Sequence, residues 1–433
     1  MTPRRYVVSL LGSAEFARAY TITGLVAVFA SFLIERLTST TTLVTILALL
    51  ALLGAGILFV RREELSLLRF APTSLIGFLA LAILSVLWSP RQSHTVLGWL
   101  ALLGIAVIAI TIGHVRDTLQ TVRALGDTMR WLLALSLGLE ILSGILLNVP
   151  FKTLGITGDL AYGGPIQGIF GTRNMLGFMA VVALITFVIE WRTQSVSRLV
   201  GVLSVGLAGF LALLSASPTV VVLAAAVGVT TVALTIVRHT PPARRVGTQW
   251  ALGVLVTAAL VLAFARRHQI IAMLDAGSDF SLRADLWNTI LDWVADKPTT
   301  GYGWFGSWSG GEYPFQYINY ALSEHHLSAL NAYFDVLLQL GWLGLVLFLV
   351  LGGVATVRSW LVASVRRSVV YAWTPLLLVT LAVESMFESF TLAGAGWLLL
   401  VLCALRAGQT RSWRQNIDDA QTGVIPTVGP ERP

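Results

Sequence analysis

The amino-acid sequence predicts an all-α polytopic membrane protein. Of its 433 residues, 56% are hydrophobic and 12% are charged, whereas soluble domains carry roughly 25% charged residues. The mean hydropathy is +0.80. Apolar runs long enough to cross a bilayer also recur along most of the chain. Together these observations exclude a soluble protein folded around one water-excluded core.

Twelve apolar runs are candidate transmembrane helices, because about 20 helical residues cross the hydrocarbon layer. We expect residues 1–407 to form a single transmembrane domain. The predicted spans are residues 19–34, 41–60, 72–88, 95–113, 130–148, 174–190, 199–215, 218–237, 249–265, 329–355, 370–387 and 390–406.

The distribution of basic residues predicts that both termini are cytoplasmic. With this orientation, 21 of the 29 Lys and Arg residues fall on the cytoplasmic side, in agreement with the positive-inside rule. The asymmetry accounts for the net charge of +7, so no nucleic-acid partner is expected. No cleavable signal pattern precedes the first span. The prediction is a multi-pass protein of the bacterial inner membrane with a disordered cytoplasmic tail at 408–433.

The longest predicted extracytoplasmic segment is residues 266–328, between the ninth and tenth spans. Its apolar residues between 281 and 296 recur with the period of a helix. We expect an amphipathic helix on the membrane surface, with Ser281 as N-cap and an end at Lys297 and Pro298. Arg283 falls in the predicted first turn, where a cation opposes the helix dipole. Its position therefore indicates either a ligand contact or a solvated arginine.

A glycine-rich approach, "GGPIQGIFGTRNMLGF", leads into the predicted span at 174–190. Arg173 stands at its extracytoplasmic end. Arginine at such a position is either a snorkelling anchor or a ligand for an anionic substrate.

A second polar cluster, "EHHLSALNAYFDVLLQLG", lies at the start of the span predicted at 329–355. His325 and His326 precede Asn331, Tyr333 and Asp335. Ionisable groups near membrane depth are candidate functional residues. Three further carboxylates near membrane depth have no assigned role: Glu140, Glu384 and Glu388.

Familiar metal and nucleotide motifs are missing from the sequence. It has no P-loop, no HExxH, no DxD in the outer segments and no Cys/His metal spacing. We therefore expect no metal and no cofactor. Arginine would then neutralise the charge of an anionic substrate.

Several stretches resemble the O-antigen ligase and exopolysaccharide polymerase family. "SLRADLWNTILDWVADKPTTGYGWFGSW" has an arginine, an apolar–Trp pair and a "P..G.G" turn, and in "LNAYFDVLLQLGWLGLVLF" Asn331 is separated from Gly341 as in the family. "GIFGTRNMLGF" and "LSVLWSPRQS" resemble the polymerase branch. The similarity extends over residues 80 to 350.

The resemblance implies a GT-C-like glycosyltransferase that uses a polyprenyl-diphosphate-linked glycan in the outer leaflet. It would transfer the glycan to the hydroxyl of a glycan or lipid-glycan acceptor. Arg283 and Arg173 would bind the diphosphate, and a histidine beside the asparagine would activate the acceptor. The implied acceptor-side residues are Asn331, Tyr333 and Asp335.

One departure from the family concerns the base. The family's histidine immediately precedes the asparagine, and here Leu330 occupies that position. His326 lies four residues before Leu330 and would share its face if the helix extended that far; His325 is the second candidate. Two explanations of Leu330 stay open: a relocated base, or a variant or inactive form that lacks its base. The alternative functions are a transporter or flippase of lipid-linked glycan and a non-catalytic partner in cell-envelope assembly.

Overall fold

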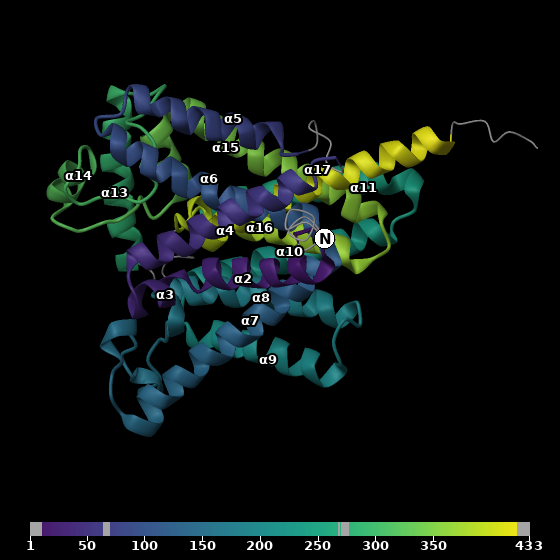
Figure 1. Cartoon of the computed structure of the whole chain (residues 1–433), viewed down its shortest axis with the longest axis horizontal. Helices are drawn as coiled ribbons and strands as arrows, with labels where there is room; N and C mark the ends of the chain where they lie inside the picture. Colours follow the sequence, from purple (N-terminus) through teal and green to yellow (C-terminus); the bar gives the residue numbers. More distant parts are fainter. Residues whose placement is uncertain (1–10, 64–69, 267–268, 270–276, 422–433) are drawn as a thin grey trace, which may run out of the picture.

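The computed structural model describes residues 11–63, 70–266, 269 and 277–421. Over these residues the chain is helical, and its β-structure is limited to one isolated bridge between Phe151 and Ile156. The all-α class predicted from composition is thus confirmed. Figure 1 shows most helices aligned along the long axis, with α13 and α14 at one end and α11 and the C-terminal part of α17 at the other.

Each of the twelve predicted spans coincides with helix. The longer helices are α2 (Ala14–Phe29), α3 (Ser31–Leu37), α4 (Thr40–Val60), α5 (Thr73–Leu84), α6 (Gln92–Val115), α7 (Thr118–Ile141), α8 (Arg173–Arg192), α9 (Arg198–Leu214), α10 (Pro218–His239), α11 (Pro242–Ala265), α13 (Gly277–Asp296), α14 (Phe315–Leu322), α15 (Ala332–Val365), α16 (Trp373–Glu384) and α17 (Gly394–Gln421).

When helices are judged by their length and composition, fewer of them qualify as membrane spans than the twelve predicted. Among the described residues, six helices are long and apolar enough to cross a membrane: α4, α6, α7 with its continuation to Leu147, α8, α10 and α15. The bent pair α2 and α3 makes a seventh if it is one span. Four other apolar helices are 10–17 residues long, shorter than the roughly 20 residues needed to cross the hydrocarbon layer. The count of twelve is not confirmed.

Helix α8 lies inside the bundle and α4 lies at its periphery. The apolar window of α8 is 72% buried against other parts of the chain, and that of α4 is 22% buried. α8 packs against α7, α9, α10 and α16. Its first residues, Arg173 and Asn174, are therefore held on the most enclosed of the six helices that are long enough to span a membrane.

The amphipathic helix predicted at 281–296 is present as α13, but it begins at Gly277. Ser281 therefore lies inside the helix rather than at its N-cap, and Arg283 lies in the second turn. The prediction of the start was wrong because the apolar stripe marks where a helix packs, whereas backbone hydrogen bonds can begin earlier. Leu286, Ile290 and Val294 are buried, and α13 packs on α15.

The end of the chain is helical further than the last predicted span. α17 continues through residues 408–421, which belong to the segment predicted as a tail. Residues 422–433 lie outside the described residues.

Candidate functional site

A kink in α15 holds the glycine-aromatic turn that follows α13. At Gly341 the backbone leaves the helical conformation, with φ 64° and ψ −166°. The interrupted helix leaves carbonyls free, and Tyr302 N donates to Leu338 O and Gly303 N to Gln339 O, at 3.1 and 2.8 Å. A Cβ at Gly341 would lie 2.4 Å from the backbone of Thr299. Gly341 is therefore needed for two reasons: its positive φ favours glycine, and a side chain would have no room there.

Asp335 and Gln339 fix the rest of this turn from within α15. The Asp335 carboxylate accepts from Trp308 Nε1 at 2.7 Å and from Ser389 Oγ at 2.6 Å. Gln339 Oε1 accepts from the backbone of Phe305 at 2.7 Å. Asp335 is 1% exposed. Its oxygens thus serve internal contacts that join the 304–308 turn to the segment after α16.

Asn331 is the N-cap of α15. Its Oδ1 accepts from Tyr333 N and Phe334 N, and its Nδ2 donates to Met386 O at 2.9 Å. The Tyr333 hydroxyl donates to Ala382 O at 2.8 Å. The predicted acceptor-side residues Asn331, Tyr333 and Asp335 are therefore brought together by the structure, but through contacts to the loop of residues 385–394 and the end of α16.

Glu388, on that loop, joins two segments that are distant in sequence. Arg283 Nη2 lies 2.9 Å from Glu388 Oε1, and Asn174 Nδ2 donates to the same oxygen at 2.7 Å. Arg283 Nη1 donates to Leu330 O at 3.1 Å and also to Phe387 O. The start of α8 and α13 thus converge on one carboxylate, and Arg283 also contacts the segment before α15.

Arg173 directly precedes Asn174 and is the first residue of α8, after the N-cap Thr172. Its backbone position puts it beside the amide that contacts Glu388. A helix N-terminus carries a positive partial charge. The start of α8 and the Arg283 guanidinium thus bring hydrogen-bond donors and positive potential to the Glu388 carboxylate, an arrangement that favours an anion.

His326 lies in the loop between α14 and α15, not on an extension of α15. α15 does not extend back to His326, because Ser323 and Leu330 adopt the left-handed conformation, with φ 51° and 50°, which ends regular helix on both sides of this loop. Asn319 holds the loop: its Oδ1 accepts from His326 N and its Nδ2 donates to His326 O. Spacing along a helix therefore does not relate His326 to Asn331.

The His326 ring lies close to a carboxylate and is mostly covered. Its Nε2 is 3.0 Å from Glu324 Oε2, and the side chain is 11% exposed. Burial lowers the pKa of His326 below its ordinary value; Glu324 opposes this shift, and the charge of Arg283 adds to it. The imidazole is thus held neutral near pH 7. His325 is exposed.

Two of the unassigned carboxylates also have identifiable surroundings. Glu140 Oε1 accepts from the backbone of Gln167 and Gly168 at 3.2 and 2.8 Å, so it ties the segment before α8 to α7. Glu384 is fully buried near Thr391, at 3.5 Å. In the described part of the chain, neither carboxylate is hydrogen-bonded to Arg283 or to the Glu388 carboxylate, although the Glu384 carbonyl accepts from Glu388 N at 3.0 Å.

Residues 203–349 match the family model of O-antigen ligase. This part of the chain is similar to O-antigen ligases. The match covers about a third of the sequence and includes Arg283, His326 and the kink at Gly341. No curated protein matches the chain. The family resemblance predicted from the motifs is confirmed, and it implies a glycosyltransferase-like activity on lipid-linked glycans in polysaccharide biosynthesis.

The O-antigen ligase-like region meets residues outside the match at the candidate site. Asn174 and Glu388, which contact each other and hold Arg283, lie before and after residues 203–349. Reasoning from sequence singled out the neighbourhood of Asn174 but assigned no role to Glu388. In the sequence, Glu388 stands out only as a carboxylate among apolar residues, and nothing there indicates its partner.

A cavity of about 350 Å³ lies between α6 and the turn that follows α13. It is lined by α6, the turn at 304–309 and the start of α17, including His94, Trp304, Phe305, Trp308 and Trp397. Trp308, which lines the cavity, donates to Asp335, and Asp335 accepts from Ser389, the neighbour of Glu388. The cavity and the Arg283 cluster are therefore linked through a single carboxylate.

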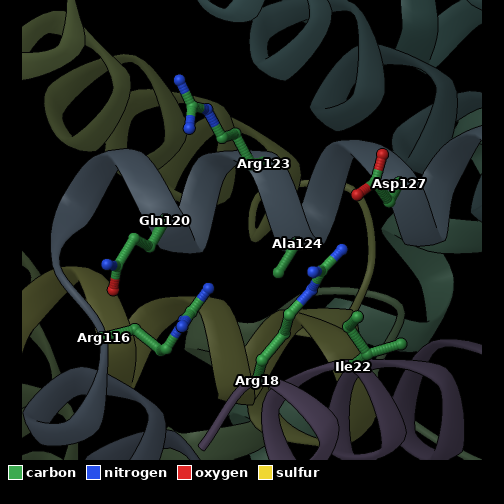
Figure 2. Close-up of a pocket in the computed structure, with 7 residues that line it drawn as sticks. All are labelled: Arg18, Ile22, Arg116, Gln120, Arg123, Ala124 and Asp127. Atoms are coloured by element: carbon green, nitrogen blue, oxygen red, sulfur yellow. The ribbon is translucent and has the colours of Figure 1, made fainter. Parts of the chain in front are cut away.

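Another cavity, of about 290 Å³, lies between α2 and α7 and is lined by Arg18, Arg116 and Arg123. Figure 2 shows the guanidinium groups of Arg18 and Arg116 turned toward α7. It lies at the end of the bundle where α7 begins, whereas α8 begins with Arg173 at the opposite end. This second cavity is basic, but none of its lining residues lies within the O-antigen ligase match.

No group of three or more metal-ligating side chains occurs in the part of the chain that the structure describes. The charged groups available at the candidate site are thus the arginines, the histidines and the carboxylates named above.

Proposed function

We propose that this chain transfers a glycan from a polyprenyl diphosphate carrier to an acceptor hydroxyl, without a metal. The reaction would occur at the end of the bundle that carries α13 and α14, facing the extracytoplasmic side, with both termini in the cytoplasm. The observation that carries the proposal is the convergence of Arg283 and Asn174 on Glu388, beside the first residue of α8.

Arg283 and Arg173 are the proposed diphosphate ligands. A departing diphosphate accumulates negative charge, and guanidinium groups neutralise such charge with paired hydrogen bonds. The Arg283 side chain is 16% exposed, so one face remains open to a ligand. Glu388 would hold Arg283 and Asn174 in place before the donor arrives, and the diphosphate would then compete with the carboxylate for the guanidinium.

His326 is the proposed base, with His325 as the second candidate. A base needs a neutral imidazole, and the lowered pKa of His326 supplies one near pH 7. The charge of Arg283 contributes to that shift, so the electrostatics of the arginine and the histidine are coupled. In this proposal His326 replaces the family's histidine, whose position is Leu330, from a loop rather than from α15.

Asn331, Tyr333 and Asp335 are proposed as positioning residues on the acceptor side. Their hydrogen bonds run to Met386, Ala382 and Ser389. They would keep the loop of residues 385–394 against the 304–308 turn and so fix the distance between donor and acceptor.

The test uses the purified full chain in lipid vesicles with a polyprenyl-diphosphate-linked glycan and follows release of free polyprenyl diphosphate. We expect Arg283→Ala and Arg173→Ala to lower release by about 100-fold, as loss of one charge-stabilising donor does. Arg266→Ala, at an exposed arginine that ends α11, is the matched control and should retain activity.

Two other outcomes would replace the proposal. Movement of the lipid-linked glycan across the vesicle membrane without release of diphosphate would indicate a flippase. Binding of the glycan lipid with neither movement nor release would indicate an assembly partner. Normal release by both arginine variants would remove Arg173 and Arg283 from the site.

A further inference from the structure

A histidine–carboxylate pair stands at the cavity between α6 and the 304–309 turn. His94 Nδ1 lies 3.0 Å from Glu312 Oε1. The Glu312 side chain is 8% exposed and that of His94 is 48% exposed. The carboxylate therefore lies behind the imidazole, and the imidazole is accessible from the cavity that it lines.

This contact determines which ring nitrogen faces a ligand. A carboxylate at Nδ1 accepts the proton carried there, so the neutral ring keeps its lone pair on Nε2. Nε2 can then accept a hydrogen bond from a hydroxyl group. His94 is thus oriented as an acceptor toward the cavity by a buried partner, as in sites where a second group fixes the tautomer.

The remainder of the cavity wall suits a flat, partly apolar ligand. Its lining includes the side chains of Trp304, Trp308 and Trp397 and the backbone of Gly306. Trp304 Nε1 is buried and has no acceptor among the described residues. A site with aromatic walls and few polar groups recognises a ligand that has both apolar faces and hydroxyl groups.

The close packing of the cavity wall shows that this arrangement is built into the fold. A Cβ at Gly98 on α6 would lie 2.4 Å from Phe305 O, so only glycine allows the turn to approach the helix. The turn itself is held by Gln339, which accepts from Phe305 N and Gly306 N at 2.7 and 3.0 Å. The same kinked helix therefore positions the cavity and the Arg283 cluster.

We propose that this cavity binds a sugar unit of the acceptor glycan, with His94, oriented by Glu312, accepting a hydrogen bond from a sugar hydroxyl. The inference rests on the proposed function and deepens it by assigning the acceptor subsite. His94 is a recognition residue here, and His326 remains the base. The two histidines should therefore affect different kinetic constants.

The experiment compares His94→Gln and Glu312→Gln with His326→Gln in the diphosphate-release assay at varied acceptor concentration. We expect the first two to raise the acceptor KM by about tenfold with little change in kcat, since they remove ground-state and transition-state binding alike. His326→Gln should lower kcat by about 100-fold. His239→Gln, at an exposed histidine that ends α10, is the matched control.

A direct binding measurement accompanies the kinetics. The probe is the free acceptor glycan used in the release assay, titrated against the full chain while tryptophan fluorescence is followed. Ala101→Trp, at an exposed position that lines the cavity, fills the space without altering the pair. We expect wild type to bind the probe and both His94→Gln and Ala101→Trp to bind it at least about tenfold more weakly.

The failures of the two proposals can be told apart. If wild type releases diphosphate and the His94 and Glu312 variants keep the wild-type acceptor KM, the acceptor subsite is refuted alone. If wild type releases no diphosphate, the transferase proposal fails, and the fluorescence titration still tests the cavity. Equal binding of the probe by wild type and Ala101→Trp refutes the subsite in either case.

Discussion

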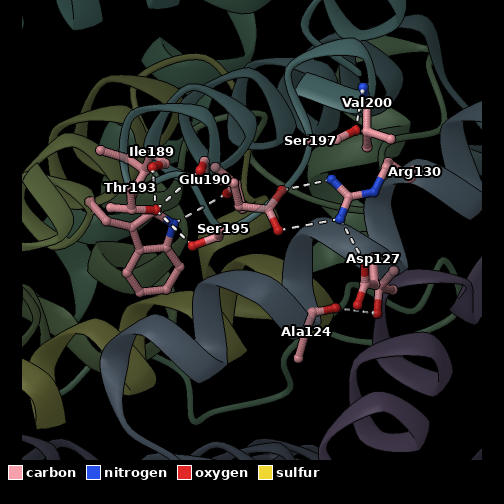
Figure 3. Close-up of polar contacts among 12 residues, drawn as sticks. Ala124, Asp127, Arg130, Ile189, Glu190, Thr193, Ser195, Ser197 and Val200 are labelled. Carbon is pink, nitrogen blue, oxygen red and sulfur yellow. Dashed lines mark hydrogen bonds and ion pairs between the residues drawn. The ribbon is translucent and has the colours of Figure 1, made fainter. Parts of the chain in front are cut away.

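Two arginine–glutamate pairs in this molecule have the same chemistry and different surroundings. Arg130 and Glu190 join α7 to α8: Nη1 and Nη2 of Arg130 lie 2.7 and 3.3 Å from the two oxygens of Glu190. Asp127 adds a third contact at 2.6 Å, and the ring of Phe187 lies under the guanidinium. Figure 3 shows Arg130 between the carboxylates of Glu190 and Asp127.

Arg283 and Glu388 make a looser pair. One guanidinium nitrogen reaches one carboxylate oxygen, and that oxygen is shared with Asn174. The other arginine contacts are to backbone carbonyls. A doubly bonded pair with its carboxylate fully enclosed stabilises packing, whereas a pair joined by one bond to a carboxylate on a loop can exchange partners. This difference separates a structural arginine from a candidate ligand.

Arg130→Ala should give the largest change in stability. The substitution leaves Glu190, whose side chain is 1% exposed, buried without its main partner, and breaking such a pair costs about 3–5 kcal/mol. Thermal unfolding in nanodiscs should show a lower transition temperature, with diphosphate release per folded molecule unchanged. Arg192→Ala, at the exposed end of α8, is the control. An unchanged transition temperature in Arg130→Ala would contradict the structural role that separates the Arg130 pair from the Arg283 pair.

Gly341→Ala should destabilise the end of the bundle that holds Arg283. Alanine must adopt a conformation reserved for glycine and would meet the backbone of Thr299 at 2.4 Å, so we expect a loss of about 1–3 kcal/mol. Diphosphate release should fall along with stability, because carbonyls at the same kink hold Tyr302 and Gly303, which lead into the 304–308 turn. Gly352→Ala, on the same helix and with open space around its Cβ, should leave both measurements unchanged.

Glu388→Gln should keep the shape of the Arg283–Glu388 pair and remove the negative charge of its carboxylate. The amide oxygen can still accept from Asn174, and Arg283 no longer has a competing anion. We expect the chain to stay folded and the donor KM to fall by about tenfold, the effect of roughly 1.4 kcal/mol. A higher donor KM would indicate that Glu388 contributes to the binding of the donor and does not compete with it.

Glu324→Gln should produce the smallest effect, a shift in the pH dependence. His326 has a lowered pKa, and Glu324 raises it, so removal of the carboxylate lowers the pKa further. The neutral base exists above this pKa, and transfer is lost as pH falls through it. The acidic limb of the rate profile, measured from about pH 5 to 8, should therefore move to lower pH. A shift to higher pH would exclude His326 as the base.

The candidate site was partly predictable because local patterns carry chemical information. Arg283, Arg173 and the histidine pair were recognisable from residue type and neighbourhood. The start of α13 was not predictable from its apolar stripe, and neither was the loop that carries His326. In both places a backbone conformation, rather than the side-chain pattern, decides where helix begins or ends.

Composition and hydropathy by themselves determined an all-α membrane protein, and the Asn331–Gly341 spacing with the "P..G.G" turn determined its resemblance to O-antigen ligases. The amphipathic stripe of α13 also followed from sequence, since helical periodicity is a local property. Only the tertiary structure decided that Glu388 is the partner of Arg283, 105 residues away. It also paired His94 with Glu312, because contacts between segments depend on helix packing that no local pattern encodes.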